Sequence, residues 1–181
     1  MKPCAHCSTP FTPQRMGQRV CGPSCAYRLV RAEKKAEIAT TRAKKQALKR
    51  IPDLIREAQT EFNKWVRARD HAQPCISCGK PPGDMTQLHA GRDAGHYRST
   101  GSAAHLRFHE DNCHAQCVQC NQWKAGNAVD YRLGLLARIG RDRVEALEAD
   151  NRPHKWTREQ LETVKSYYKT KLKALQAQQT N

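Results

Sequence analysis

Cysteine spacing is the feature that most constrains how this chain can fold. Eight of the nine cysteines fall into pairs whose members are separated by two or three residues. The pairs make two quartets, which are Cys4, Cys7, Cys21 and Cys25, and Cys75, Cys78, Cys117 and Cys120. Four thiolates satisfy one tetrahedral Zn²⁺, and such a closed site replaces part of a hydrophobic core. We therefore expect two structural zinc ions, with Cys113 as a small buried residue outside both sites.

Paired cysteines can also form disulfides, so the compartment matters. The N-terminal residues show no apolar signal region, and no apolar run approaches the roughly 20 residues that span a bilayer. The sequence therefore favours zinc over disulfides and predicts a soluble, cytoplasmic protein without membrane association. Hydrophobic residues make up only 38% of the 181-residue chain, so we expect a small core supported by metal.

The chain carries 32 Lys and Arg residues against 17 Asp and Glu residues, a net charge of +15. This surplus favours a polyanionic partner, and nucleic acid is the first candidate. Much of the charge lies in residues 26–50, a segment without Gly or Pro that predicts a helix. The helix is either a solvated linker or a phosphate-contacting element, and its one-sided charge favours contact. The residues expected to contact nucleic acid are Arg31, Lys34, Lys35, Lys44, Lys45 and Lys124.

Changes in pattern divide the chain into four parts. Residues 1–27 are expected to form a Cys4 zinc finger, either a purely structural unit or one that contacts DNA or protein. Residues 28–51 form the basic helix or linker. Residues 52–151 form a central domain with packing helices, and residues 152–181 form a C-terminal basic helix.

Apolar residues at helical spacing predict further helices. Pro52 breaks the chain, and Asp53 is expected to cap a helix with a core-facing stripe. The stripe consists of Leu54, Ile55, Ala58, Phe62, Trp65 and Val66. Helices are also expected over residues 131–139, 143–149 and 158 to about 176. Thr157 and Gln160 have the spacing of a capping box for the last of these.

The central domain is expected to hold two short strands and a helix around the metal. The strands are predicted at His89–Tyr97 and Leu106–His109, joined by a loop. A helix should begin at Cys117–Lys124 and end at Gly126, because glycine readily terminates helices. This order predicts a ββα arrangement.

The central cysteines lie among polar residues that form a specific pattern. It consists of Asp93-Ala-Gly-His96-Tyr97, Asn112-Cys-His-Ala-Gln-Cys117-Val-Gln-Cys120 and the directly following Asn121. On these motifs, and with similarity over most of its length, the chain resembles the NinG (Rap) family of phage recombination endonucleases, which carry an HNH or His-Me finger domain. The resemblance implies an α+β, mostly helical fold, with a small zinc-stabilised ββα-metal (HNH) core, an N-terminal zinc finger and flanking basic helices.

The resemblance also implies roles for the polar residues. His96 would be the general base that activates water, and Asn112 would orient the loop that bears it. Asn121 and Asp93 would hold one catalytic Mg²⁺ or Mn²⁺. One position departs from the family pattern, because Gly95 stands where an acidic ligand usually precedes the base directly. Either Asp93 reaches the metal or another group holds it.

The chemistry of these residues suits phosphodiester hydrolysis independently of the resemblance. A neutral imidazole near pH 7 can accept a proton from water. A carboxylate and an amide oxygen can hold Mg²⁺ and leave positions open for phosphate and water. As alternatives, His96 could be an ordinary strand histidine and Asn121 a helix cap. Four histidines have no firm role: His114 is an additional metal-ligand candidate, and His89, His105 and His109 could contact phosphate.

The function implied by the resemblance is that of a metal-dependent, structure-selective DNA endonuclease, encoded by a phage or prophage in a bacterial host. Its substrates would be branched double-stranded DNA, including Holliday junctions and D-loops, and phage recombination proteins or a second copy of the chain would be further partners. The alternative is a non-catalytic, zinc-dependent DNA-binding protein, and a protein-interaction zinc module is a third class. Only the nuclease requires Asp93, His96 and Asn121 together.

Overall fold

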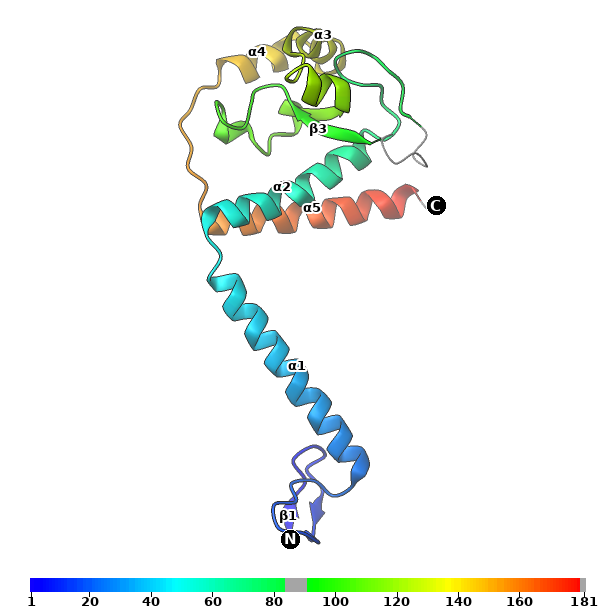
Figure 1. The fold of residues 1–181 in the computed structure, drawn as a ribbon, viewed down its shortest axis with the longest axis vertical. Helices are drawn as coiled ribbons and strands as arrows, with labels where there is room; N and C mark the ends of the chain where they lie inside the picture. The colour runs from blue at the N-terminus through cyan, green and yellow to red at the C-terminus, as the bar shows by residue number, and fades with distance from the viewer. Residues whose placement is uncertain (84–90, 180–181) are drawn as a thin grey trace. The chain divides into compact units, whose positions relative to one another are not determined.

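The computed structural model describes residues 1–83 and 91–179, drawn as a coloured ribbon in Figure 1. These residues form two compact units, Met1–Lys49 and Arg50–Asn181, which are described separately. His89, where a strand was expected to begin, lies outside the described residues. Within the described ranges, no helix is both long enough and apolar enough to cross a membrane.

The first unit consists of a small sheet and one long helix. Strand β1 (Lys2–Pro3) pairs antiparallel with β2 (Pro10–Phe11), and α1 (Pro23–Ala47) follows. The expected basic helix is confirmed, although it begins three residues earlier than predicted because proline is tolerated in a first turn. Helix α1 buries none of its side chains, so it depends on good helix-forming residues rather than on packing.

The second unit is built on two helices that lie side by side and run in the same direction, α2 (Ile51–Arg69) and α5 (Arg158–Gln179) (Figure 1). The predicted apolar stripe on α2 is confirmed for those of its residues that are buried, and these residues pack chiefly against α5. The ring centroids of Phe62 and Tyr168 lie 4.7 Å apart in an edge-to-face contact, which favours aromatic pairing. The larger core cluster also includes Leu54, Trp65 and Leu161.

The predicted cap of α2 was wrong by three residues, whereas that of α5 was right. Arg50 is the N-cap of α2, and Asp53 lies in the first turn, where its Oδ2 accepts the Arg50 backbone N–H at 3.2 Å. At α5 the predicted capping box is confirmed. Thr157 N–H donates to Gln160 Oε1 at 3.0 Å, and Gln160 N–H donates to Thr157 Oγ1 at 3.3 Å.

Strand β3 (Arg92–His96) pairs antiparallel with β4 (Cys113–Cys117), in a register that places Asp93 opposite Gln116. The prediction of a second strand at 106–109 was wrong. Leu106 is the last residue of the 3₁₀ helix η1 (Ala104–Leu106), and residues 107–109 form the turn that leads to the 3₁₀ helix η2 (Glu110–Asn112). Ala103 and Leu106, three residues apart, are buried in the same cluster, which is a helical rather than a strand period.

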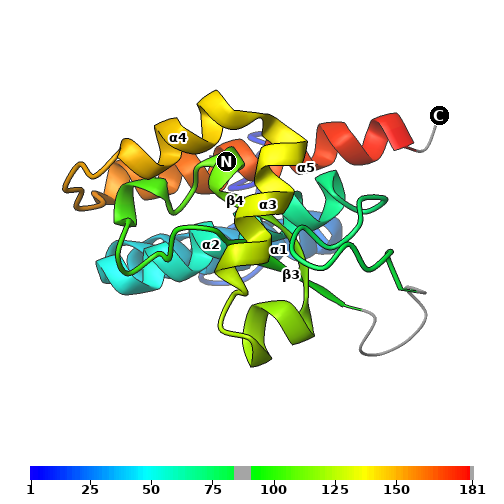
Figure 2. The ribbon, with the colours of Figure 1, turned by 90° about the horizontal axis from the view of Figure 1, so that it is seen from above.

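A short π-helical turn, η3 (Gln119–Trp123), follows β4, and α3 (Ala128–Ile139) and α4 (Arg141–Ala149) come next. The expected stop at Gly126 is confirmed. With φ at +88°, this glycine donates its N–H to the carbonyls of Cys120 and Asn121. Helix α3 lies over one face of the β3–β4 sheet, with α4 beside it against η2, and α2 lies on the other face, packed against α5 (Figures 1 and 2). The fold is therefore a mostly helical α+β fold with two small sheets.

Candidate metal centres and active site

Both predicted cysteine quartets come together in space. Within each quartet, the four Sγ atoms lie within 4.8 Å of one another, so each could hold one zinc ion. In the central quartet, burial of the Cys75 thiol opposes ionisation. Backbone N–H groups of Cys78 and Cys117 outweigh it and lower the pKa of Cys75 to about 7. Burial raises the pKa of Cys117 and Cys120, so thiolates at these two positions would need the charge of a bound cation.

Asp93 and Asn121, which lie 28 residues apart in the chain, meet beside the central quartet. Asp93 Oδ2 accepts hydrogen bonds from Asn121 Nδ2 and Gln122 Nε2, each at 2.8 Å. Asp93 is on β3, and both amides are on η3, directly after the last cysteine of the quartet. A zinc ion in that quartet would fix η3 and thereby hold the amides over the carboxylate.

The structure explains why the acid stands at position 93 and not directly before His96. A Cβ atom built on Gly95 would overlap Gln116 Oε1 and lie 3.0 Å from Gln116 Cβ. Gln116 is fully buried, and its Nε2 donates to Ser77 Oγ at 2.8 Å and to the Gly126 carbonyl at 2.6 Å. Residue 95 therefore has no space for a side chain. Asp93 is two residues away and projects from the same face of β3.

The imidazole of His96 is held by the loop that follows β3. Its Nε2 lies 2.9 Å from the Arg107 carbonyl oxygen, so Nε2 carries the proton and Nδ1 is a hydrogen-bond acceptor. Burial lowers the pKa of His96, against the raising effect of this hydrogen bond, so the ring is neutral at pH 7. Nδ1 lies 3.8 Å from the buried thiol of Cys113.

His96 does not share a face of the strand with Asp93. The two are three residues apart, and successive side chains of a strand point to opposite faces. His96 lies toward α2, with its ring centroid 6.2 Å from that of Phe62, whereas Asp93 lies toward η3. The structure therefore brings Asp93 and Asn121 together and places His96 on the other side of β3.

Asn112 is fully buried and binds the chain segment directly after His96. Its Oδ1 accepts the Arg98 N–H at 2.8 Å, and its Nδ2 donates to the carbonyls of Arg98 at 3.0 Å and Leu106 at 3.1 Å. These three bonds fix both ends of the loop between β3 and η1. This geometry suits the loop-orienting role predicted for Asn112, which stays a prediction.

His114 belongs to a buried ion network instead of facing Asp93 and Asn121. Its Nδ1 accepts a hydrogen bond from Arg69 at 3.1 Å and lies 3.6 Å from Asp70, and its Nε2 donates to the Asp111 carbonyl at 3.2 Å. Both ring nitrogens are therefore engaged. Asp70 and its neighbours were not predicted, because their one local signal is the adjacent Arg69–Asp70 pair at the end of an amphipathic helix.

The cationic residues expected to contact nucleic acid are all exposed. They are Arg31, Lys34, Lys35, Lys44 and Lys45 on α1, and Lys124 directly after η3. Exposure leaves their charged groups available to phosphate.

Comparison with known proteins gives the family. A family model described as Bacteriophage Lambda NinG protein matches residues 1–178. This chain belongs to the NinG family. It is 39% identical to Protein ninG of Escherichia phage lambda over 93% of this chain and 89% of the relative. It is 40% identical to Protein ninG of Salmonella phage P22 over 93% and 90%, respectively. Protein ninG of Escherichia phage 933W is 46% identical over 73% of this chain and 63% of the relative.

The predicted bacteriophage family is thereby confirmed, and no solved structure matches the chain. The NinG name specifies no chemistry, so any activity has to be argued from the site.

Proposed function

We propose that this NinG protein is a divalent-metal-dependent endonuclease that cuts branched DNA, including Holliday junctions and D-loops. The observation that carries the proposal is the pairing of Asp93 with Asn121 at the turn after the central cysteine quartet. A purely structural role would not require a carboxylate and two amides at a partly exposed turn of a strongly basic protein. Metal-assisted phosphodiester hydrolysis would use them.

The Asp93 and Asn121 side chains fit a hard divalent cation. Asn121 turns its Nδ2 toward Asp93 here, and a rotation of the amide by about 180° would present Oδ1 instead. One carboxylate and one amide oxygen are ligands that Mg²⁺ or Mn²⁺ accepts, with other positions left for water and phosphate oxygens. When bound there, the cation would supply charge neutralisation at the phosphate and acidify a bound water.

His96 is our proposed general base. Its neutral ring, with Nε2–H fixed on the Arg107 carbonyl, leaves Nδ1 as the proton acceptor. Because β3 separates His96 from Asp93, the two act from different sides of the strand. Asp93 and Asn121 would hold the cation that neutralises the phosphate, and His96, the last residue of β3, would accept the proton from water.

DNA binding would come from the exposed cations of α1 and from Lys124, with the N-terminal finger as a further contact. Phosphate contacts carry no base information, so selectivity for branched over linear DNA must arise elsewhere. Phage recombination proteins and a second copy of the chain are the further partners we propose.

Cleavage of labelled four-way, D-loop and linear DNA, with and without Mg²⁺, tests the proposal. We expect Mg²⁺-dependent cleavage of the branched substrates. His96→Asn should lower the rate roughly 10²- to 10⁴-fold, the usual cost of losing a general base. Asp93→Ala and Asn121→Ala should raise the Mg²⁺ concentration needed or abolish activity.

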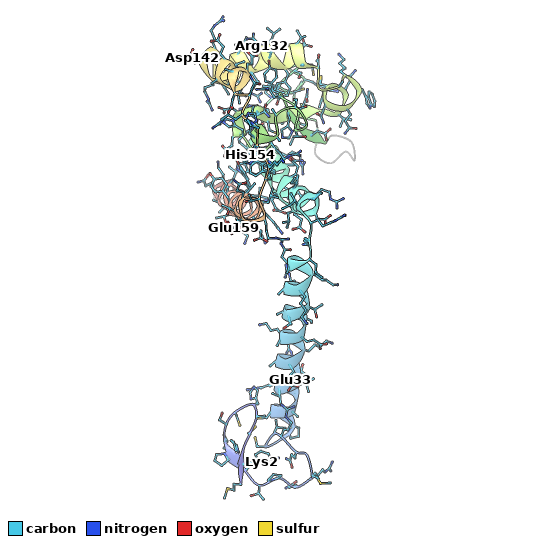
Figure 3. All side chains as sticks on the ribbon, turned by 90° about the vertical axis from the view of Figure 1, so that its left-hand side faces the viewer. Lys2, Glu33, Arg132, Asp142, His154 and Glu159 are labelled. Atoms are coloured by element: carbon cyan, nitrogen blue, oxygen red, sulfur yellow. The ribbon has the colours of Figure 1, made fainter. Side chains whose placement is uncertain are left out.

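Two variants serve as controls. His71→Ala and Asp142→Ala remove an exposed histidine and an exposed acid, the latter labelled in Figure 3, and both should cleave normally. Zinc content and circular dichroism establish that each variant is folded. Full activity of His96→Asn would refute its role as base. Tight DNA binding without cleavage of any branched substrate would instead favour a non-catalytic zinc-dependent DNA-binding protein.

A further inference from the structure

A cavity of about 290 Å³ lies between the loop that precedes η2 and the first half of α5. Aromatic rings and imidazoles form most of its lining: His105, Phe108, His109, Trp156, Tyr167 and Tyr168. The Asp93–Asn121 pair and both cysteine quartets contribute nothing to it. The cavity is therefore distinct from the proposed metal site.

Hydrogen bonds to backbone groups hold its walls in place. Trp156 donates its Nε1–H to the Ala104 carbonyl at 3.0 Å, and the Tyr168 hydroxyl donates to the Phe108 carbonyl at 3.0 Å. The rings of Phe108 and Trp156 meet edge to face with centroids 4.8 Å apart. His154, labelled in Figure 3 near the start of α5, packs against Trp156 at 4.4 Å. These contacts preform the cavity, so a ligand would not have to order it.

The rim offers polar groups with assignable roles. His109 Nδ1 accepts the Asp111 backbone N–H at 3.3 Å, so its Nε2 carries the proton and can donate. His105 Nε2 lies 3.0 Å from the Asp150 carbonyl, so its Nδ1 is an acceptor. Tyr167 is 53% exposed and presents an aromatic ring to solvent. The cavity thus combines ring faces with a donor and an acceptor, the features that bind a planar heterocycle.

We propose that this cavity binds one unpaired nucleobase of a branched DNA. Its volume is at the low end of small-molecule sites, which suits one base and not a base pair. Residues 152–181 carry seven basic residues against two acids, Glu159 and Glu162. The seven are Arg152, Lys155, Arg158, Lys165, Lys169, Lys171 and Lys173. Ion pairs engage Arg152, Arg158, Lys165 and Lys171. Lys155, Lys169 and Lys173 are therefore the cations most available to phosphate.

The location of the cavity links it to the proposed chemistry. Arg107, whose carbonyl holds the His96 ring, lies between His105 and Phe108 of the cavity wall. A base bound against Phe108 therefore contacts the same short segment that orients His96. Extruding a base costs least where it is already unpaired, so this site selects DNA with interrupted pairing. The inference rests on the proposed function for its substrate and adds a source of selectivity for D-loops and other branched DNA with unpaired bases.

Binding to three DNAs, with Ca²⁺ in place of Mg²⁺ to prevent cleavage, tests the inference. One is a fully paired duplex, the second has a single extra adenosine, and the third has an abasic nucleotide in its place. Stacking of one base on aromatic side chains gives about a 5- to 150-fold gain in affinity. We expect that gain for the extra adenosine over the abasic site. Tyr167→Ala should remove most of it, and Tyr167→Phe should retain it.

Tyr27→Ala is the matched control, because Tyr27 is a 65% exposed tyrosine on α1, outside the cavity. It should leave the ratio between the adenosine and abasic DNAs unchanged. An equal affinity of the unmodified protein for those two DNAs would overturn the inference, as would a full preference in Tyr167→Ala. A change in oligomeric state on Tyr167→Ala without a change in the ratio would also overturn it and indicate a protein interface. This experiment measures binding alone. A protein that prefers the extra adenosine but cleaves no DNA would therefore refute the proposed nuclease function and leave the base-binding site standing.

Discussion

Replacement of Asp70 should be among the most destabilising single changes in the second unit. Asp70 follows α2, is 4% exposed and connects that helix to β4, because its Oδ2 accepts the buried Ala115 backbone N–H at 2.9 Å. Arg69 binds both of its oxygens, at 2.6 and 2.8 Å. Arg138 of α3 approaches Oδ2 to 4.0 Å, so one carboxylate joins three elements.

The expected loss follows from the charges left behind. Breaking a buried ion pair by removing one partner costs about 3–5 kcal/mol, since the other charge remains uncompensated. The side chains of Arg69 and Arg138 keep 25% and 20% of their exposure, so water screens them in part. We therefore expect about 3 kcal/mol for Asp70→Ala, a large share of the 5–15 kcal/mol typical of a whole domain. Asp70→Asn should lose less, because an amide oxygen can still accept the Ala115 N–H.

Urea unfolding of the zinc-loaded protein, followed by circular dichroism, measures the effect. Glu145→Ala is the control, because Glu145 pairs with Arg141 on the surface and such pairs contribute less than about 1 kcal/mol. Burial alone would raise the pKa of Asp70, but hydrogen bonds from the Arg69 guanidinium and the Ala115 backbone N–H hold it well below its usual range. Its contribution should therefore be present at neutral pH and disappear as the pH falls below about 4. A loss for Asp70→Ala no larger than that for Glu145→Ala would refute the reasoning.

Four further predictions test other parts of the structure. Metal analysis should find two zinc ions per chain, and removing them should unfold the segment around the central quartet, as seen by circular dichroism. Gly134→Ala should lower the stability measured by thermal unfolding by about 1–3 kcal/mol, although alanine is the better helix former. The new Cβ would overlap the Ile76 carbonyl oxygen and lie 2.9 Å from the carbonyl carbon, whereas the control Leu133→Ala, at an exposed position, should change stability little. Burial lowers the pKa of both His96 and His114, so as the pH falls the unfolded chain takes up protons before the folded chain does. The free energy of unfolding should therefore decrease below about pH 6.5, by up to roughly 1.4 kcal/mol per pH unit for each ring. Four Lys→Gln changes on α1 should reduce the slope of log affinity for DNA against log salt by up to about 3.6, if each lysine contacts a phosphate; an unchanged slope would make α1 a solvated linker. These lysines are Lys34, Lys35, Lys44 and Lys45.

Local patterns explain what could be predicted from the sequence. Cysteine pairs at fixed spacing carry their own geometry, and both quartets assemble as expected. The stripe on α2, the capping box of α5 and the helix stop at Gly126 are likewise decided within a few residues. The second strand was misplaced because Leu106 and Phe108 alternate with polar residues as a strand does. The burial of Ala103 together with Leu106 marks the helical period that was overlooked.

Features that depend on distant pairing could not be read in this way. The network of Asp70 joins residues from α2, β4 and α3, and no local pattern announces which arginine will meet which carboxylate. The absence of an acidic residue at position 95 also depends on distant pairing. It follows from the side chain of Gln116, which becomes a neighbour only through the register of β3 with β4.

The relation between Asp93 and His96 combines both kinds of information. Once the strand is granted, their separation by three residues already requires opposite faces, so this much was available from the sequence. The sequence did not show which face of β3 meets η3, because that depends on where the central quartet folds the chain after β4. Two amides on η3 and a carboxylate on β3 meet only if that turn is fixed. Under the proposed function, loss of the central zinc should therefore abolish Mg²⁺-dependent cleavage and leave intact the DNA binding proposed for α1, which lies in the other unit.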